Sequence, residues 1–256
     1  YGHFTTRQNI QYNWPKLVDV PDILAELAEV EMHAIQTSGN CIRNVTADHF
    51  AGVASGEVED PRVYAELVRQ WSTLHPEISF LPRKFKIAVI GTEKDRAAMR
   101  LHDIGLRIQS NSTGEVGFQV LVGGGLGRTP YIAPTVREFL PKKHILSYLE
   151  AILRIYNQLG RRDNLYKARI KILVDSVGIQ EFKLMVEKEW EEIKGGPLTV
   201  PTEEYARILA YFAPPNYEIS GLQPNILESQ KTDNDDFSLW CRTNLAEHKQ
   251  PGYSII

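Results

Sequence analysis

The sequence reads Phe80-Leu81-Pro82-Arg83-Lys84-Phe85-Lys86-Ile87-Ala88-Val89-Ile90, where three basic residues run into four aliphatic ones. The aliphatic run predicts a buried strand from Phe85 to Ile90. Side chains alternate between the two faces of a strand, so Lys84 and Lys86 share one face and Arg83 and Phe85 the other. Two ammonium groups on one face repel each other, unless water or a bound anion lies between them. The segment is therefore either a solvated strand start or part of an anion site.

Upstream of this strand, the pattern predicts one strand and two helices. The strand covers Phe4 to Tyr12 and places Thr5, Arg7, Asn9 and Gln11 on one polar face. A helix is expected from Pro21 to Gln36, with Pro21 in its first turn. A second helix opens at Asp60-Pro61, with Asp60 as its cap, and ends at His75-Pro76.

Downstream, a short helix capped by Thr92 is expected through Met99, and a hairpin joins Gly105–Gln109 to Val116–Val122. Apolar spacing predicts three further helices, Pro141–Leu159, Asn164–Val177 and Ile179–Ile193. The stretch Gly195 to Asp236 contains five prolines and is expected to be a long connector with one candidate helix, Thr202–Tyr211. A strand is expected from Phe237 to Leu245.

Composition excludes several classes of protein. The 256 residues are 43% hydrophobic and 24% charged, with a net charge of −3, so no global basic field favours nucleic acid. No apolar run approaches the ~20 residues of a membrane helix. Two distant cysteines argue against a disulfide framework and favour a reducing cytoplasm. The chain starts at Tyr1 without Met and stops in an apolar run, so we expect both ends to be cut from a longer polypeptide.

Two loops carry candidate binding groups. The first loop follows a predicted helix end and reads Asn40-Cys41-Ile42-Arg43-Asn44. Its Arg43 either makes a bidentate contact with an oxyanion or donates hydrogen bonds to the carbonyls at the helix end. Cys41 beside Arg43 is either reactive, with a lowered thiol pKa, or simply packed, which is the default. The run from Gly123 to Gly127 allows close backbone approach, and its free N–H groups suit carboxylates or phosphates. The alternative for this run is a tight turn.

A basic run begins a predicted helix at Arg161, Arg162, Lys167, Arg169 and Lys171. Lys167 and Lys171 are expected on one helix face, and a solvated basic face is the ordinary explanation. The glycine run lacks the dinucleotide and P-loop patterns, and there is no metal-hydrolase or acyl-transfer motif. These absences argue against a flavin or nicotinamide oxidoreductase that uses the glycine loop.

Taken in order, these segments resemble the sulfite and nitrite reductase hemoprotein family. The resemblance covers essentially the whole chain, and its two most specific blocks are Leu81 to Lys86 and Leu121 to Leu126. It implies an α+β fold with a mixed or antiparallel sheet covered by helices, flanked by pieces of ferredoxin-like half-domains. The implied divisions are 1–20 for the end of the first half-domain, 21–196 for the siroheme- and anion-binding domain, 197–235 for a connector, and 236–256 for the start of the second half-domain.

The resemblance also implies a chemistry, the six-electron reduction of sulfite to sulfide, or of nitrite to ammonia, at siroheme bridged to a [4Fe–4S] cluster. Arg43, Lys84 and Lys86 would surround the anion. Siroheme carries eight carboxylates, whose burial requires concentrated positive charge. Its expected ligands are Arg7, Gln11, Asn44, Arg83, Gly123, Gly124, Gly125, Lys167 and Arg169.

Family nitrite reductases usually have Asn where Lys86 stands, so the Lys-Phe-Lys form favours sulfite. The chain departs from the family in lacking one upstream arginine that contacts the anion. It also has only Cys41 and Cys241, whereas the cluster needs four thiolates, which we expect after residue 256. The resemblance implies either a ferredoxin or an NADPH-flavoprotein subunit as electron donor, and no role for nucleic acid or membrane. The remaining alternative is a non-enzymatic α+β module that binds anions.

Overall fold

A five-stranded mixed sheet forms the centre of the protein, whose computed structural model describes residues 1–217 and 226–256. Its strands lie in the order β3 (Thr46–Ala47), β4 (Ile87–Ile90), β5 (Ile104–Ser110), β6 (Val116–Val122) and β7 (Thr135–Pro141). The pairs β3–β4 and β4–β5 are parallel, and the pairs β5–β6 and β6–β7 are antiparallel. The expected α+β class with a mixed sheet is confirmed.

The two faces of this sheet are covered unequally. One face, with Ile87, Val89 and Leu106, joins the main core together with residues of the helices that pack on it. The opposite face contributes Ala88 and Ile90 to a much smaller apolar cluster. The aliphatic run after Lys86 is thus buried on both sides, and the less covered face is the one that Lys86 shares with Ala88 by strand parity.

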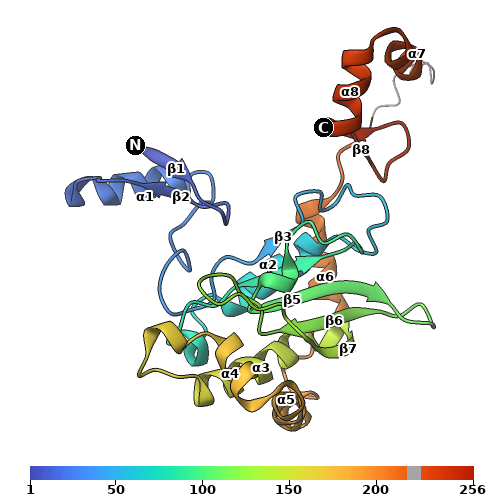
Figure 1. Ribbon diagram of the computed structural model, residues 1–256. Coiled ribbons are helices and arrows are strands. Elements are labelled where there is room, and N and C mark those ends of the chain that lie inside the picture. The colour runs from blue at the N-terminus through green and yellow to red at the C-terminus, as the bar shows by residue number, and fades with distance from the viewer. Residues whose placement is uncertain (218–225) are drawn as a thin grey trace.

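Five helices contribute residues to the main core, and Figure 1 shows α3, α4 and α5 gathered on one side of the sheet. Asp60 caps α2 as expected, because its carboxylate accepts the Arg62 backbone N–H at 2.9 Å. Short 3₁₀ helices cover Leu17–Asp19, Pro76–Ile78, Met99–Leu101, Lys142–His144, Leu165–Lys167 and Ala210–Phe212. The five helices are α2 (Pro61–Ser72), α3 (Ile145–Leu159), α4 (Ile170–Val177), α5 (Ile179–Ile193) and α6 (Thr202–Leu209).

Two smaller parts stand away from this body (Figure 1). The N-terminal finger, residues 1–35, consists of the hairpin β1 (Gly2–Phe4) and β2 (Ile10–Tyr12) followed by α1 (Val20–Ala28), which has no buried residue. The C-terminal lobe, residues 226–256, contains α7 (Ile226–Asp233), α8 (Asp235–Asn244), β8 (Ala246–Glu247) and β9 (Ser254–Ile255).

The strand expected from Phe4 to Tyr12 is wrong, because the chain reverses within it. The Thr5 N–H donates to the Asn9 carbonyl at 2.8 Å, and Gln8 adopts a left-handed φ of 57°. The helix expected through Gln36 ends at Ala28, and Glu31 has a φ of 59°, which no α-helix accommodates. Arg7 therefore occupies a turn, and Gln11 lies on the returning strand.

Two further predictions fail because side chains cap the backbone differently. The stretch from Thr92 to Met99 forms turns in place of a helix, since Asp95 accepts the Met99 backbone N–H at 2.9 Å. The strand expected from Phe237 to Leu245 is helix α8, because Asn234 accepts the Phe237 N–H at 3.0 Å and two aspartates follow the cap.

The hairpin of β5 and β6 and the bounds of α5 agree with the sequence prediction. Strand β7 was missed, and α3 and α4 begin later than expected, at Ile145 and Ile170. The expected connector from Gly195 to Asp236 contains α6 and α7, and its residues 218–225 lie outside the described part. Within the described residues, no helix combines the length and the apolar character needed to cross a bilayer.

Candidate anion and cofactor site

Lys84 and Lys86 flank Phe85, which forms an isolated parallel bridge with Ile42 directly before β4, whereas Arg83, expected on the face opposite Lys84, lines the same cavity as Lys84. The Phe85 side chain is fully buried in the main core and packs against Tyr156, with ring centroids 5.4 Å apart. The two lysines are half-buried. Because Phe85 points into the helix-covered core, alternation places both lysines toward the other face of the sheet.

Arg43 is brought beside these lysines by backbone pairing between two loops. The Arg43 N–H donates to the Phe85 carbonyl at 2.8 Å, and the Phe85 N–H donates to the Cys41 carbonyl at 3.0 Å. The guanidinium of Arg43 donates from Nη1 to the Thr37 carbonyl at 2.6 Å and from Nε to the Gly39 carbonyl at 3.2 Å. Arg43 thus stabilises its own loop and leaves fewer N–H groups for an anion.

Asp103 is the buried counter-charge of the site, and sequence reasoning missed it. Its Oδ1 accepts from Arg169 Nε at 2.9 Å and Nη2 at 2.6 Å, and its Oδ2 accepts the Lys86 backbone N–H at 2.8 Å. Burial raises the pKa of this carboxyl, and Arg169 opposes the shift. One carboxylate therefore joins the start of α4 to the start of β4. A charged residue directly before a buried strand was the available signal.

Arg7 enters the site from the tip of the N-terminal finger. Its Nη2 donates to the Asn44 carbonyl at 2.6 Å, and its Nη1 lies 2.8 Å from Nε2 of His102. The Asn44 side chain in turn donates to the Arg7 carbonyl. The Nε of Arg7 is buried without a hydrogen-bond partner among the described residues. An unsatisfied buried donor is costly, which favours a ligand at this point.

Neighbouring cations and burial lower the pKa values of several basic side chains at this site. Burial first, and then the charges of Arg7, Lys84 and Arg169, lower the pKa of Lys86 to about 8, against the opposing effect of Asp103. Burial, followed by Arg169 and Arg43, lowers the pKa of Lys84. Burial also lowers the pKa of Arg7 to about 10. These cations repel one another, and a single carboxylate does not balance their charge. A bound anion would reduce that repulsion.

A cavity of about 600 Å³ adjoins this cluster. Its size lies within the range of ligand pockets. Its wall carries one acidic residue, Asp175, whose Oδ2 accepts from the Tyr131 hydroxyl at 3.0 Å. The six basic residues in its lining are Arg83, Lys84, Arg128, Lys167, Arg169 and Lys171. Such a surplus of positive charge matches a ligand that carries several carboxylates.

The glycine run lies against this basic wall. A Cβ on Gly124 would lie 2.5 Å from the carbonyl oxygens of Arg100 and His102, and one on Gly125 would lie 3.0 Å from Lys171 Cδ. The expectation of free amides fails at two positions, because the Gly123 N–H donates to the Asp103 carbonyl at 2.9 Å and the Gly125 N–H to Tyr131 at 3.0 Å. The glycines allow close packing, and Lys171 fastens the loop by donating to the Leu126 carbonyl at 3.2 Å.

Several expected residues lie outside the cluster. Gln11 is exposed on the finger and donates to Asn13 at 2.9 Å. Lys167 is exposed at the rim of the cavity, and α4 starts only at Ile170, so Lys167 does not share a helix face with Lys171. The thiol of Cys41 donates to the Ser38 carbonyl at 3.2 Å, and burial raises its pKa. Cys41 is therefore a packed thiol, as the default interpretation held.

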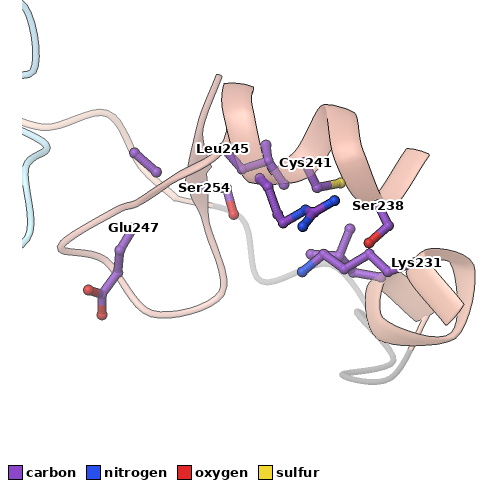
Figure 2. Close-up of a pocket in the computed structure, with 9 residues that line it drawn as sticks. Lys231, Ser238, Cys241, Leu245, Glu247 and Ser254 are labelled. Atoms are coloured by element: carbon purple, nitrogen blue, oxygen red, sulfur yellow. The ribbon is translucent and has the colours of Figure 1, made fainter. Parts of the chain in front are cut away.

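A second cavity, of about 290 Å³, lies in the C-terminal lobe, and Figure 2 shows Lys231, Ser238 and Cys241 lining it. Its lining comes only from residues 227–254 and includes none of the cluster residues. The part of the chain that the structure describes contains no group of three or more His, Cys, Asp or Glu side chains placed for a metal. Two cysteines in the whole sequence do not fit a four-thiolate cluster.

The structure combines a mixed α+β body with a cavity lined by basic residues, and comparison with known proteins identifies its family. Residues 38–194 match the family described as nitrite and sulphite reductase 4Fe-4S domain. The chain belongs to this family, so the resemblance stated from the sequence is confirmed.

The relatives include enzymes with either substrate in their names. The chain is 34% identical to the chloroplastic ferredoxin–nitrite reductase of Arabidopsis thaliana over 72% of its length, and 30% identical to sulfite reductase [ferredoxin] 1 of Mycolicibacterium paratuberculosis over 77%. The solved structure of Mycobacterium tuberculosis NirA superposes with a TM-score of 0.69 at 29% identity, covering 75% of this chain and 35% of that one. The chain spans about a third of these curated relatives, 32% and 36% respectively.

Proposed function

We propose that this chain supplies the cationic side of a centre that reduces sulfite to sulfide by six electrons, with nitrite as the alternative substrate. One observation carries the proposal. The charges of Arg7, Lys84 and Arg169, residues up to 162 positions apart in the sequence, all lower the pKa of Lys86, and the buried Asp103 accepts from both Arg169 and the Lys86 backbone N–H. The charge is concentrated where a cavity opens.

The cavity suits siroheme, a macrocycle with several carboxylates. Arg83, Lys167, Arg169 and the glycine run would hold it, with Arg7 and Asn44 at the finger side. When bound, siroheme supplies an iron centre that ligates the anion and delivers electrons to it. Gln11 requires a change in the finger to take part, because its side chain is now bonded to Asn13.

Lys84 and Lys86 would bind the substrate and provide protons. Each oxygen that leaves sulfite as water needs two protons, and an ammonium group with a pKa of about 8, as at Lys86, releases a proton near neutral pH at small cost. The same positive charge stabilises negative charge that accumulates on the anion during reduction. Arg43 would complete the cationic rim with the N–H groups that its loop leaves free.

Sulfite is preferred over nitrite in this proposal because Lys86 adds a second ammonium group for the more highly charged anion. The test is Lys86→Asn in the complete enzyme, with kcat/KM measured for both anions. We expect a fall in sulfite kcat/KM relative to nitrite of about tenfold, the loss of one charge-assisted contact. An unchanged ratio would remove Lys86 as the discriminator.

Cofactor binding is tested by adding siroheme to the purified chain and recording its visible absorption. Lys167→Met, at the rim of the cavity, is expected to weaken binding, whereas Lys188→Met, exposed on α5, is the matched control and is expected to leave it unchanged. No spectral change with the complete enzyme would refute the siroheme proposal and favour a non-enzymatic module that binds anions.

The electron-delivering cluster must come from cysteines other than Cys41 and Cys241, so we expect the chain alone not to turn over. Reduction of sulfite by this chain with reduced methyl viologen would contradict that expectation. A ferredoxin donor agrees with the names of the relatives, and an NADPH-flavoprotein subunit is the alternative. The proposed setting is the cytoplasm.

A further inference from the structure

His102 contacts Arg7, which lies 95 positions away in the sequence, and this contact determines the tautomer and the charge of the imidazole ring. Nε2 lies 2.8 Å from Nη1 of Arg7, and Nδ1 lies 2.8 Å from the carbonyl oxygen of Ala98. A carbonyl oxygen only accepts and a guanidinium only donates, so Nδ1 carries the hydrogen and Nε2 presents its lone pair. His102 is therefore a neutral imidazole in one defined tautomer.

The loop that presents the Ala98 carbonyl is itself tightly held. Ala98 has a left-handed φ of 52°, which is unfavourable for a residue with a Cβ. Asp95 accepts the backbone N–H groups of Met99 at 2.9 Å and Arg100 at 3.4 Å, which holds the loop in that conformation. Backbone strain of this kind persists where the surroundings over-determine it. The direction of the His102 ring is thus set from the body of the protein.

Arg7, by contrast, comes from a part of the chain with little support of its own. Helix α1 of the finger buries no residue, and the large apolar side chains near the tip, such as Phe4, are exposed. The Arg7 guanidinium is bonded at Nη2 to Asn44 and at Nη1 to His102, while its Nε has no partner among the described residues. Two acceptors on the body therefore define the plane of a guanidinium carried by a weakly packed finger.

We propose that His102 is a positioning residue, whose neutral Nε2 accepts a hydrogen bond from Arg7 and so fixes that guanidinium on the siroheme side of the cationic cluster. This inference rests on the proposed function. His102 acts through Arg7, and Asp103, the next residue, acts in the same way on Arg169. Adjacent side chains would then orient two arginines, Arg7 and Arg169, that lie 162 positions apart in the sequence.

A double-mutant cycle tests whether His102 acts through Arg7. Siroheme affinity of the purified chain is measured by absorbance titration for His102→Leu, His102→Gln, Arg7→Gln and the double variant. We expect His102→Leu to weaken binding about tenfold, the effect of one hydrogen bond to a charged group. His102→Gln retains an acceptor and should restore most of the affinity. In the Arg7→Gln background, His102→Leu should change affinity less than about twofold. Equal losses in both backgrounds would overturn the proposal.

A second measurement does not depend on siroheme. Nitrogen-15 NMR of the ring should show hydrogen on Nδ1 and none on Nε2 in the parent chain, and the Nε2 resonance should move in Arg7→Gln. Hydrogen on Nε2 in the parent, or no change in Arg7→Gln, would overturn the proposal.

If the complete enzyme binds no siroheme, the proposed function fails by itself. The cycle is then repeated with sulfate as the probe, where coupling supports the role of His102 and its absence refutes it.

Discussion

The central body and the two projecting parts of this molecule are stabilised in different ways. The body has one continuous apolar core that joins β4, β5 and β6 to α2, α3 and α5. The N-terminal finger buries no residue of α1 and contacts the body through polar groups of Arg7 and Asn9. The C-terminal lobe contacts the body through residues 247–249. Lys84 and Lys86 are therefore positioned by the packed core of the body, whereas Arg7 belongs to the finger and is oriented by hydrogen bonds to the body.

The largest effect that this comparison predicts is at Phe85, whose side chain has no exposed surface. Phe85→Ala should destabilise the body by ~3–5 kcal/mol, because it leaves a cavity between β4 and α3. Urea unfolding monitored by circular dichroism gives the free energy. Phe4→Ala in the finger is the matched control, since Phe4 is 82% exposed, and it should change stability by less than ~0.5 kcal/mol. Similar losses in both variants would refute the contrast.

The same contrast explains how much of the fold the sequence predicts. In the body, long apolar periodic runs determine burial, so the sequence predicts α5 at its observed bounds and the strands β5 and β6 of the hairpin to within one residue. In the finger and the lobe, single polar contacts decide the conformation. The turn at Gln8 and the cap at Asn234 convert two expected strands into a hairpin and a helix. Strand propensity alone carries no information on such caps.

For the site, the sequence predicts which residues are basic but not what orients them. The sequence singles out Lys84, Lys86 and Arg169, and the charges of Lys84 and Arg169 act on the pKa of Lys86 in the structure. Asp103 and His102 were missed, because their roles depend on a parallel pairing of β4 with β5 and on a reversed finger that no local pattern encodes. The glycine run was identified, but the partners of its amides emerge only from the tertiary structure.

The next largest effect is expected at Asp103. Asp103→Asn removes the fully buried carboxylate that pairs with Arg169 and should cost ~3 kcal/mol, because it leaves an unpaired guanidinium. Asp163→Asn is the control, since Asp163 pairs with Arg161 at the surface and its loss should not measurably change the unfolding midpoint. If the two variants unfold at the same urea concentration, Asp103 is not the anchor of the cluster.

A pH titration sharpens the role of His102. Burial, followed by the charges of Arg7 and Lys86, lowers its pKa from 6.5 to about 4, against Ala98 and Asp95, which raise it. The unfolded chain then binds more protons between pH 6.5 and 4, so stability falls as pH decreases through this window. The full shift corresponds to ~3 kcal/mol, and partial exposure of the ring reduces this to about 2 kcal/mol. His102→Gln should lose that part of the slope, whereas an identical pH profile would contradict the assignment.

The smallest effect concerns the tether of the C-terminal lobe. Lys249 donates its backbone N–H to the Val53 carbonyl at 2.8 Å, and its Nζ lies 3.3 Å from Glu57, whose side chain is 2% exposed. Burial raises the pKa of Glu57, and Lys249 opposes that shift. Lys249→Met removes the opposing charge and should ease local opening of residues 246–249 by ~1 kcal/mol, seen as faster hydrogen exchange there. Lys231→Met is the control, because Lys231 pairs with Glu228 inside the lobe and should leave that exchange unchanged. Faster exchange in the body as well as in the lobe would mean that the lobe contributes to the core, and the distinction between the two regions would then fail.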